Sequence, residues 1–167
     1  MEKADVPHFI QRVAIRGPTF QNLADIARTQ LQAFGGKAEI VCGPISTGGY
    51  GNVVANLLMF NHAIEVLQAH DRRVWSQVPF EAGLAELHNK WMEEHPTATY
   101  CYPIMADFYW PILTPDLVCR AWFIDGERGW ETSTGAKMEW QRLGELGIDR
   151  RLFKEEWHRT FVPPSDL

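Results

Sequence analysis

The chain alternates between apolar runs of strand length and segments with helical patterning. The apolar runs cover residues 38–45, 73–78 and 117–124, and helical segments follow them at 52–70, 80–95 and 133–147. Strands that are apolar throughout need cover on both faces, which intervening helices supply. Since each helix returns the chain to the same end of the sheet, the alternation predicts a mainly parallel sheet between two helical layers.

One domain is the simplest organisation for a chain of 167 residues. A further helix is expected at 20–34, ended by Gly35 and Gly36, and a short strand is expected to start at Ile148. We therefore predict an α/β fold, a Rossmann-like (flavodoxin-like) three-layer sandwich with a mainly parallel sheet. Its expected parts are an N-terminal arm and helix (1–37), the α/β domain (38–150) and a C-terminal tail (151–167).

Charge and composition limit the partners of the protein. The formal net charge is −5 and no basic stripe is present, which argues against a nucleic-acid polymer as partner. The sequence shows neither an apolar leader nor a run long enough to cross a bilayer, so no membrane association is expected. The three cysteines are an odd number, and two of them lie in strand-like runs. They indicate buried thiols rather than a disulfide framework, and hence a cytoplasmic protein.

No metal or other cofactor is expected. The six histidines are scattered along the chain, and no Cys-x-x-Cys motif occurs. His88 and His95 share a predicted helix but lack the spacing of metal ligands. The glycine-rich stretch GPISTGGYG matches neither the dinucleotide fingerprint nor the nucleoside-triphosphate loop.

Two glycine-rich loops connect a predicted strand to a helix, at 43–51 and 129–135. In open parallel sheets, small ligands bind beyond the carboxyl ends of the strands, where such loops enter helices. Both loops should lie on that same edge. The sequence therefore predicts a small-molecule site formed by the two loops together.

The start of the last predicted helix, WETSTGAKME, combines an anion site with a carboxylate. If Ser133 or Thr134 caps this helix, its free N–H groups and positive dipole end face any anion placed above them. The Glu139 side chain leans back over Ala136 and Gly135, which leave an open notch above it. The alternative is a surface helix end with a solvated glutamate. Ser133 is not a nucleophile-elbow serine, because glutamate stands where that motif needs glycine.

An aromatic segment at 100–110 precedes the third strand and contains Asp107. Clustered aromatic side chains are more often core or subunit interface than a platform for bases. A carboxylate among them needs either a partner or a function. Asp107 is therefore a second candidate site residue.

The order of these motifs resembles the nucleoside 2-deoxyribosyltransferase-like superfamily, which includes the deoxynucleoside 5′-monophosphate N-glycosidases. The resemblance rests on IVCGPISTGG with its following apolar helix, on Asp107, and on the Ser-x-Gly-x-x-x-Glu pattern of the last helix. It covers roughly residues 38–148. One departure concerns an aspartate that the transferases usually carry shortly before the glutamate. This chain has Glu131 in that stretch.

The resemblance implies a role for each matching position. Glu139 is the implied nucleophile, which attacks the anomeric carbon of the sugar and forms a glycosyl-enzyme intermediate. Asp107 is implied to contact the sugar or base and to assist protonation of the leaving base. Substrate-binding positions are implied at the helix start, for a 5′-phosphate, in the first loop, and at the candidate replacement for the missing aspartate: Ser133, Gly135, Gly43, Ile45, Ser46, Gly48, Gly49 and Glu131.

Two classes of function follow from the resemblance. The first is an N-glycosidase or 2-deoxyribosyltransferase that acts on a nucleoside or nucleoside monophosphate. The second is a nucleotide-binding or sensor protein with the same pocket and no turnover; a structural oligomer with a vestigial pocket is a third possibility. Family members commonly complete the site from a neighbouring subunit, which implies a homodimer or larger homo-oligomer.

Overall fold

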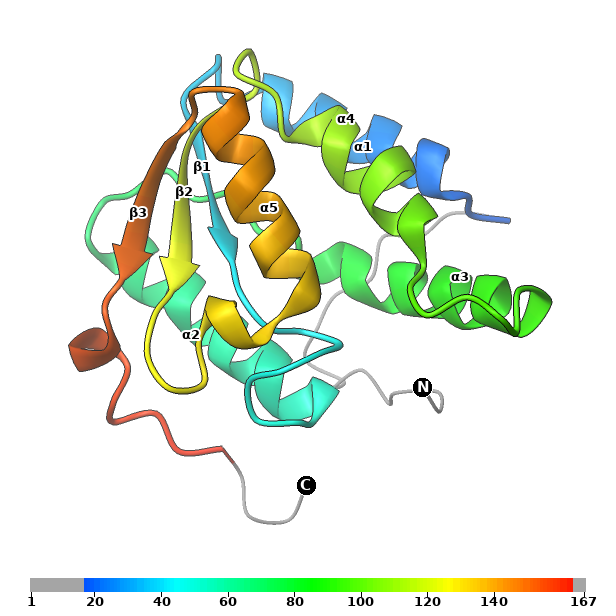
Figure 1. The fold of residues 1–167 in the computed structure, drawn as a ribbon. Coiled ribbons are helices and arrows are strands. Elements are labelled where there is room, and N and C mark those ends of the chain that lie inside the picture. The colour runs from blue at the N-terminus through cyan, green and yellow to red at the C-terminus, as the bar shows by residue number, and fades with distance from the viewer. Residues whose placement is uncertain (1–16, 164–167) are drawn as a thin grey trace.

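The computed structural model describes residues 17–163, which fold around an all-parallel, three-stranded sheet (Figure 1). Strand β2 (Val118–Ile124) lies between β1 (Ala38–Cys42) and β3 (Asp149–Phe153). Both pairings are parallel. The architecture is a Rossmann-like three-layer α/β fold, as the alternation of apolar runs and helices predicts.

Four longer helices occur in the described part of the chain: α1 (Phe20–Gln32), α2 (Val53–Ala69), α3 (Glu81–Glu94) and α5 (Thr134–Glu145). A π-helix, η2 (Ile104–Tyr109), continues into the short α4 (Trp110–Ile112). Three 3-10 turns complete the elements: η1 (Val78–Phe80), η3 (Trp130–Thr132) and η4 (Glu155–Trp157).

Three of the predicted helix starts are confirmed by capping hydrogen bonds. The side chain of Thr19 accepts from the backbone of α1, that of Asn52 from α2, and that of Ser133 from α5. Such caps satisfy N–H groups that have no partner within the helix. After α1, Gly35 and Gly36 have φ values of 63° and 77°, a left-handed backbone that ends the helix where the sequence predicts.

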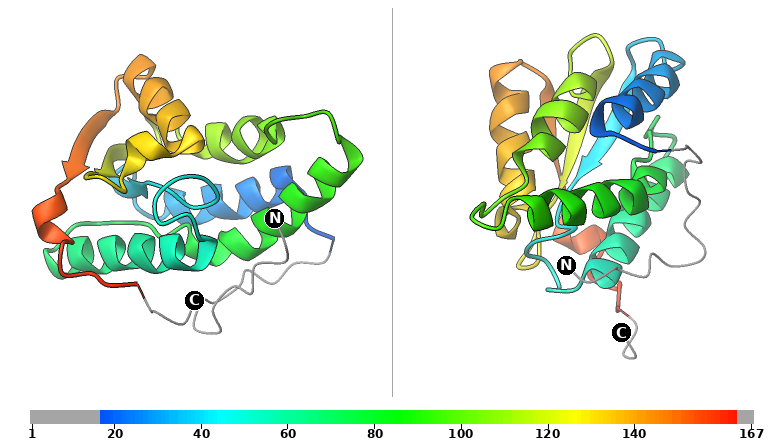
Figure 2. Two further views of the ribbon diagram at one scale, coloured as in Figure 1. Left: turned by 60° about the horizontal axis from the view of Figure 1, so that its bottom comes forward. Right: turned by 90° about the vertical axis from the view of Figure 1, so that its right-hand side faces the viewer.

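Helices cover the two faces of the sheet unequally (Figure 2). On one face, α2 packs against one residue from each strand: Val41 of β1, Ile124 of β2 and Phe153 of β3. On the other face, α1, α5 and the η2–α4 stretch enclose a core that includes Ala121 and Phe123 of β2. Alternation of side chains along the strands places successive residues in different layers.

The predicted strand at 73–78 is wrong beyond a single residue. Val74 forms one isolated parallel bridge with Glu39 of β1. The chain then leaves the sheet, because Pro79 has no N–H to donate and the neighbouring bonds are local. The Val78 N–H bonds to Ser76 at 3.2 Å, and the Phe80 N–H bonds to the carbonyl of Gln77 at 2.9 Å.

The expected domain boundaries do not coincide with breaks in the packing. Helix α1 contributes Phe20, Leu23 and Leu31 to the same core as strand β2. At the other end, β3 crosses residue 150, and Phe161 packs against the layer that α2 covers. Residues 1–16, which make up most of the predicted N-terminal arm, and the last four residues lie outside the described part of the chain.

The cysteines behave differently from one another. All three are free; Cys42 and Cys101 are buried, whereas Cys119 is exposed, so the expectation of a buried thiol is wrong at that position. The register between β1 and β2 skips Cys119, which makes it the extra residue of a β-bulge. A bulged residue leaves the regular alternation of side chains. In the described residues, no helix is long and apolar enough to span a membrane.

Candidate functional site

A cavity of about 760 Å³, including its open mouth, lies beyond the carboxyl end of β1. Its walls come from the loop after β1, from α2 and α3, from the 100–109 segment, and from the first turns of α5. The position agrees with the edge where parallel sheets bind ligands.

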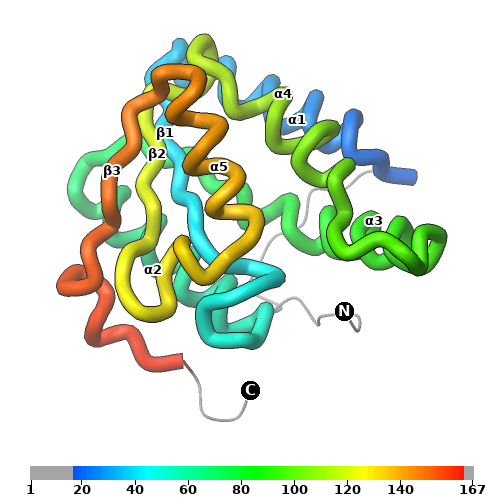
Figure 3. The backbone as a smooth tube through the Cα atoms, viewed as in Figure 1, coloured from blue at the N-terminus to red at the C-terminus, as the bar shows by residue number. Residues whose placement is uncertain are grey.

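The two glycine-rich loops meet at this edge, as the sequence predicts (Figure 3). The Gly49 N–H donates to Thr132 Oγ1 at 2.7 Å, and the Thr134 N–H donates to Thr47 Oγ1 at 3.1 Å. Gly48 has a φ of 69°, and a Cβ there would stand 2.1 Å from the carbonyl oxygen of Thr132. Only glycine allows this approach of the two backbones.

Asn56 of α2 holds the first loop in shape. Its side chain is 3% exposed. Its amide donates to the carbonyls of Ile45 at 3.0 Å and Gly48 at 3.1 Å, and its Oδ1 accepts from the Tyr50 N–H at 2.8 Å. One buried side chain therefore satisfies three backbone groups of a loop that has no regular structure.

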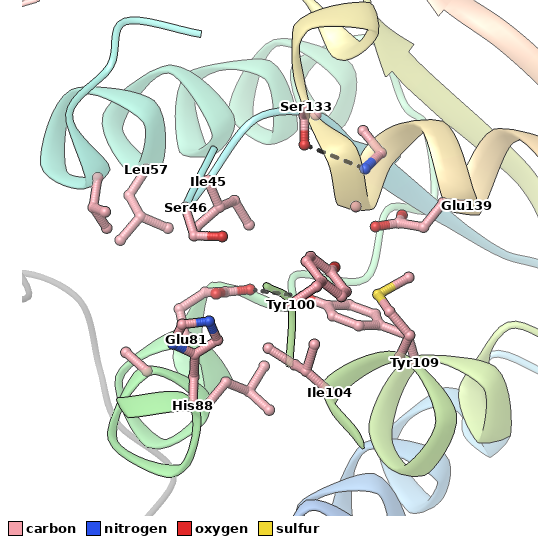
Figure 4. A pocket seen from close by; sticks show the side chains of 17 residues that line it. Ile45, Ser46, Leu57, Glu81, His88, Tyr100, Ile104, Tyr109, Ser133 and Glu139 are labelled. Carbon is pink, nitrogen blue, oxygen red and sulfur yellow. Dashed lines mark hydrogen bonds between the residues drawn. The ribbon is translucent and has the colours of Figure 1, made fainter. Parts of the chain in front are cut away.

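Glu139 and Ser133 lie on the same wall of the cavity (Figure 4). Ser133 is 4% exposed, and its Oγ caps α5 by accepting from the Ala136 N–H at 3.2 Å. Glu139 is 7% exposed and stands in the second turn of the same helix. A Cβ on Gly135 would stand 3.3 Å from the Tyr100 hydroxyl. Gly135, Ala136 and Glu139 all line the cavity, and the Tyr100 hydroxyl lies next to Gly135.

Ring contacts of Trp140 anchor α5 on the side away from the cavity. Trp140, the residue after Glu139, stacks on Trp130 with ring centroids 4.5 Å apart and an interplanar angle of 16°. Phe123 of β2 contacts Trp140 edge-on at 4.8 Å, and the Arg150 guanidinium lies 4.2 Å from the Trp140 ring. These contacts fix the rotation of α5 about its axis, so Glu139 is held toward the cavity.

A second buried carboxyl group, Glu81, faces the cavity from α3 (Figure 4). It is 7% exposed and belongs to a closed ring of three hydrogen bonds. The Gln77 amide donates to Glu81 Oε1 at 2.9 Å and to the Tyr109 hydroxyl at 3.0 Å, and that hydroxyl donates to Glu81 Oε1 at 3.2 Å. All three side chains are buried.

Burial raises the pKa values of both carboxyl groups. It raises the pKa of Glu139 to about 7; a hydrogen bond from the Cys42 thiol acts in the opposite direction, and the charge of Glu81 adds to the rise. Burial likewise raises the pKa of Glu81 to about 7, against the hydrogen bonds from Gln77 and Tyr109. Two like charges in one apolar cavity repel, so the pair favours a singly protonated state near neutral pH.

A third buried carboxylate, Glu39, differs from the other two because it forms ion pairs with Arg72 and Arg120. Burial raises its pKa, but hydrogen bonds from Arg72 and Trp122 and the charges of Arg72 and Arg120 outweigh burial and hold the pKa below its ordinary value. Neither Glu81 nor Glu139 has a salt-bridge partner in residues 17–163. Buried carboxyl groups in a cavity that lack a positively charged partner are characteristic of functional sites.

Six of the ten predicted site residues line the cavity together: Gly43, Ile45, Ser46, Ser133, Gly135 and Glu139. The other four do not line it. Gly48 lies against Thr132, and Gly49 lies against Asn56 and Pro44. Glu131 is exposed on η3. Asp107 is half-buried on the π-helix η2. The catalytic role expected for Asp107 stays a prediction.

Sequence reasoning did not identify Glu81, Gln77 or Asn56. A signal for Glu81 existed, because Leu84, Ala85 and His88 follow it at spacings of three, four and seven, on one face of a helix. A carboxylate on such an apolar face has to be buried. Asn56 had no comparable signal, because its partners are backbone groups of a loop.

The chain was compared with protein-family models, with curated proteins and with solved structures, and none of them matches. In the part of the chain that the structure describes, no group of three or more His, Cys, Asp or Glu side chains is placed to hold a metal ion.

Proposed function

We propose that this protein breaks the N-glycosidic bond of a nucleoside or nucleoside 5′-monophosphate, or transfers the sugar to another base, with Glu139 as nucleophile. One observation carries the proposal. A buried carboxyl group lies in an open cavity, in the turn after a helix N-terminus whose capping serine lines the same wall. That combination suits a sugar phosphate, because the anion sits at the positive end of the helix while the carboxylate reaches the sugar.

The chemistry needs an ionised Glu139. Its oxygen forms a bond to the anomeric carbon as the carbon–nitrogen bond breaks, and the departing base keeps the electron pair. The resulting ester is cleaved when water, or the nitrogen of a second base, attacks the same carbon and releases Glu139. With a pKa of about 7, a large share of Glu139 is ionised at neutral pH and above.

The remaining walls of the cavity suit a base. Ile45, Leu57, Leu84 and Ile104 offer apolar contacts, Tyr109 offers a ring, and Tyr100 offers a ring with a hydroxyl donor. Burial, together with the nearby ionisable groups of Glu139, Cys101 and Tyr102, raises the pKa of Tyr100 to about 12, so its hydroxyl stays protonated and can donate to a ligand. A homo-oligomer that completes this site from a second subunit is part of the proposal.

The test is release of free base. The purified protein is incubated with ribo- and deoxyribonucleosides and their 5′-monophosphates, and free base is separated by chromatography. We expect release from at least one monophosphate, and a loss of at least about 10³-fold in Glu139→Ala, because the nucleophile is gone. Glu145→Ala is the matched control, since Glu145 is exposed on the same helix.

The competing function is binding without turnover. It predicts that a monophosphate raises the melting temperature while no member of the panel yields free base. Base release that is undiminished in Glu139→Ala would instead reject the nucleophile. Addition of a second free base to a reaction that releases base separates hydrolysis from transfer, because only a transferase forms the new nucleoside.

A further inference from the structure

Glu81 stands on the opposite wall of the cavity from Glu139, and the nucleophilic step does not use it (Figure 4). It comes from α3, whereas Glu139 comes from α5. Breaking an N-glycosidic bond needs two groups, one that attacks the sugar and one that protonates the base. The site described so far supplies only the first of them.

The hydrogen bonds of Glu81 determine which of its oxygens carries the proton. Oε1 accepts from both the Gln77 amide and the Tyr109 hydroxyl, so it is occupied as an acceptor. Oε2 has no hydrogen-bond partner in residues 17–163, and it is not one of the polar atoms sealed from solvent there. In the neutral acid the proton therefore sits on Oε2, the oxygen that is free to reach the cavity.

We propose that Glu81 is the general acid that protonates the leaving base, and that Gln77 and Tyr109 are the residues that position it. The assignment rests on the proposed function. As the carbon–nitrogen bond breaks, its electron pair stays on the base, and the Oε2 proton moves to a ring nitrogen or exocyclic oxygen of that base. In hydrolysis, the Glu81 carboxylate then takes a proton from the water that cleaves the Glu139 ester. Both carboxyl groups return to their starting forms.

Other groups around the cavity fit this role less well. The titratable side chains that line it besides the two glutamates are His88 on α3, Tyr100 and Tyr109. Burial raises the pKa values of both tyrosines, which makes them poor acids. The ring of His88 lies 3.4 Å from Asn89 and lacks a buried orienting partner. Asp107 does not line the cavity.

The test separates protonation of the base from attack on the sugar. Glu81→Gln keeps an acceptor for Gln77 and Tyr109 but cannot donate an acidic proton. We expect its kcat/KM on the nucleoside or monophosphate of the panel that wild type cleaves fastest to fall by about 10²- to 10⁴-fold, the usual contribution of a general acid. With the 4-nitrophenyl glycoside of the same sugar, whose leaving group departs as a stable anion, the loss should be less than about 5-fold. Glu139→Ala should lose both reactions.

Two further variants make the outcome specific. Tyr109→Phe removes a donor that lowers the pKa of Glu81, so the alkaline limb of the pH–rate profile of this variant should move to higher pH. If Tyr109 had a purely structural role, the substitution would change the melting temperature without moving that limb. Glu94→Gln, exposed near the end of α3, is the control for the helix. If Asp107→Asn shows the dependence on leaving group and Glu81→Gln does not, the assignment of Glu81 is overturned.

The outcomes distinguish the two levels of the proposal. If wild type turns over and Glu81→Gln stays within 3-fold of it on the same nucleoside or monophosphate, Glu81 is rejected as the acid and the proposed function is left intact. That threshold lies far below the roughly 10²-fold minimum for a general acid. If wild type releases base from no member of the nucleoside and nucleotide panel, the proposed function fails, and the role of Glu81 fails with it.

Discussion

Replacing Glu139 with glutamine should make the protein more stable at alkaline pH and leave its stability at acidic pH almost unchanged. The side chain is 7% exposed, and the ordinary pKa of a glutamate, 4.5, is raised to about 7 by burial. Between these two pH values, the folded protein therefore keeps Glu139 protonated, whereas the same side chain in water would be ionised. Glutamine has nearly the same shape and carries no charge at any of these pH values.

The magnitude follows from the two pKa values. Below pH 4.5 the folded and unfolded chains both hold the proton, so Glu139 costs nothing. Between 4.5 and about 7 the unfolded chain releases the proton and the folded chain keeps it, so stability falls as the pH rises. Above about 7 the loss is complete, and at about 1.4 kcal/mol per tenfold change in proton affinity it amounts to about 3 kcal/mol.

Urea unfolding of wild type and Glu139→Gln at pH 5 and pH 8.5 measures this difference. At pH 8.5 the variant should be more stable by about 3 kcal/mol, and at pH 5 by less than about 1 kcal/mol. Glu145→Gln, on the exposed side of α5, should change stability by less than about 0.5 kcal/mol at both values. An equal difference at the two pH values would refute the reasoning, as would a loss of stability in Glu139→Gln at pH 8.5.

Three further predictions concern the loop and the pair of carboxyl groups. Asn56→Ala leaves three backbone groups of the first loop without partners and should lower the free energy of unfolding by about 2–4 kcal/mol, measured by urea unfolding. Gly48→Ala should lower the melting temperature far more than Gly51→Ala, because both glycines have φ near 70° but only at Gly48 would a Cβ meet backbone, at 2.1 Å. Base release should follow a narrow bell centred near pH 7, since Glu139 must be ionised and Glu81 protonated; a rate that is flat between pH 5 and 9 would contradict this.

The local features of the fold could be read directly from the residues. The caps at Thr19, Asn52 and Ser133 join groups three positions apart, so chain connectivity alone brings the partners together. The convergence of the two glycine-rich loops also follows from the sequence, since strands that run parallel end at the same edge. The prediction of a strand at 73–78 is wrong because Pro79 and a local turn prevent the pairing that its apolar pattern indicates.

The π-helix explains why the position of Asp107 was not predictable. Six residues of η2 adopt this wider turn, in which hydrogen bonds reach one residue farther than in an α-helix. The direction of a side chain then no longer follows the usual helical period. Ile104 and Met105 line the cavity together with Tyr109, which follows them by five and four positions, whereas Asp107 between them does not.

The sequence by itself determined the class of fold, the ends of the principal helices and the place of Glu139 above two small residues. These features depend on hydrophobic periodicity and on contacts between residues a few positions apart. Only the tertiary structure decided that Glu81 faces the same cavity as Glu139, with Gln77 and Tyr109 bonded to one of its oxygens. The two glutamates lie on different helices, and their altered proton affinities arise from shared burial, which exists only when the layers are packed together.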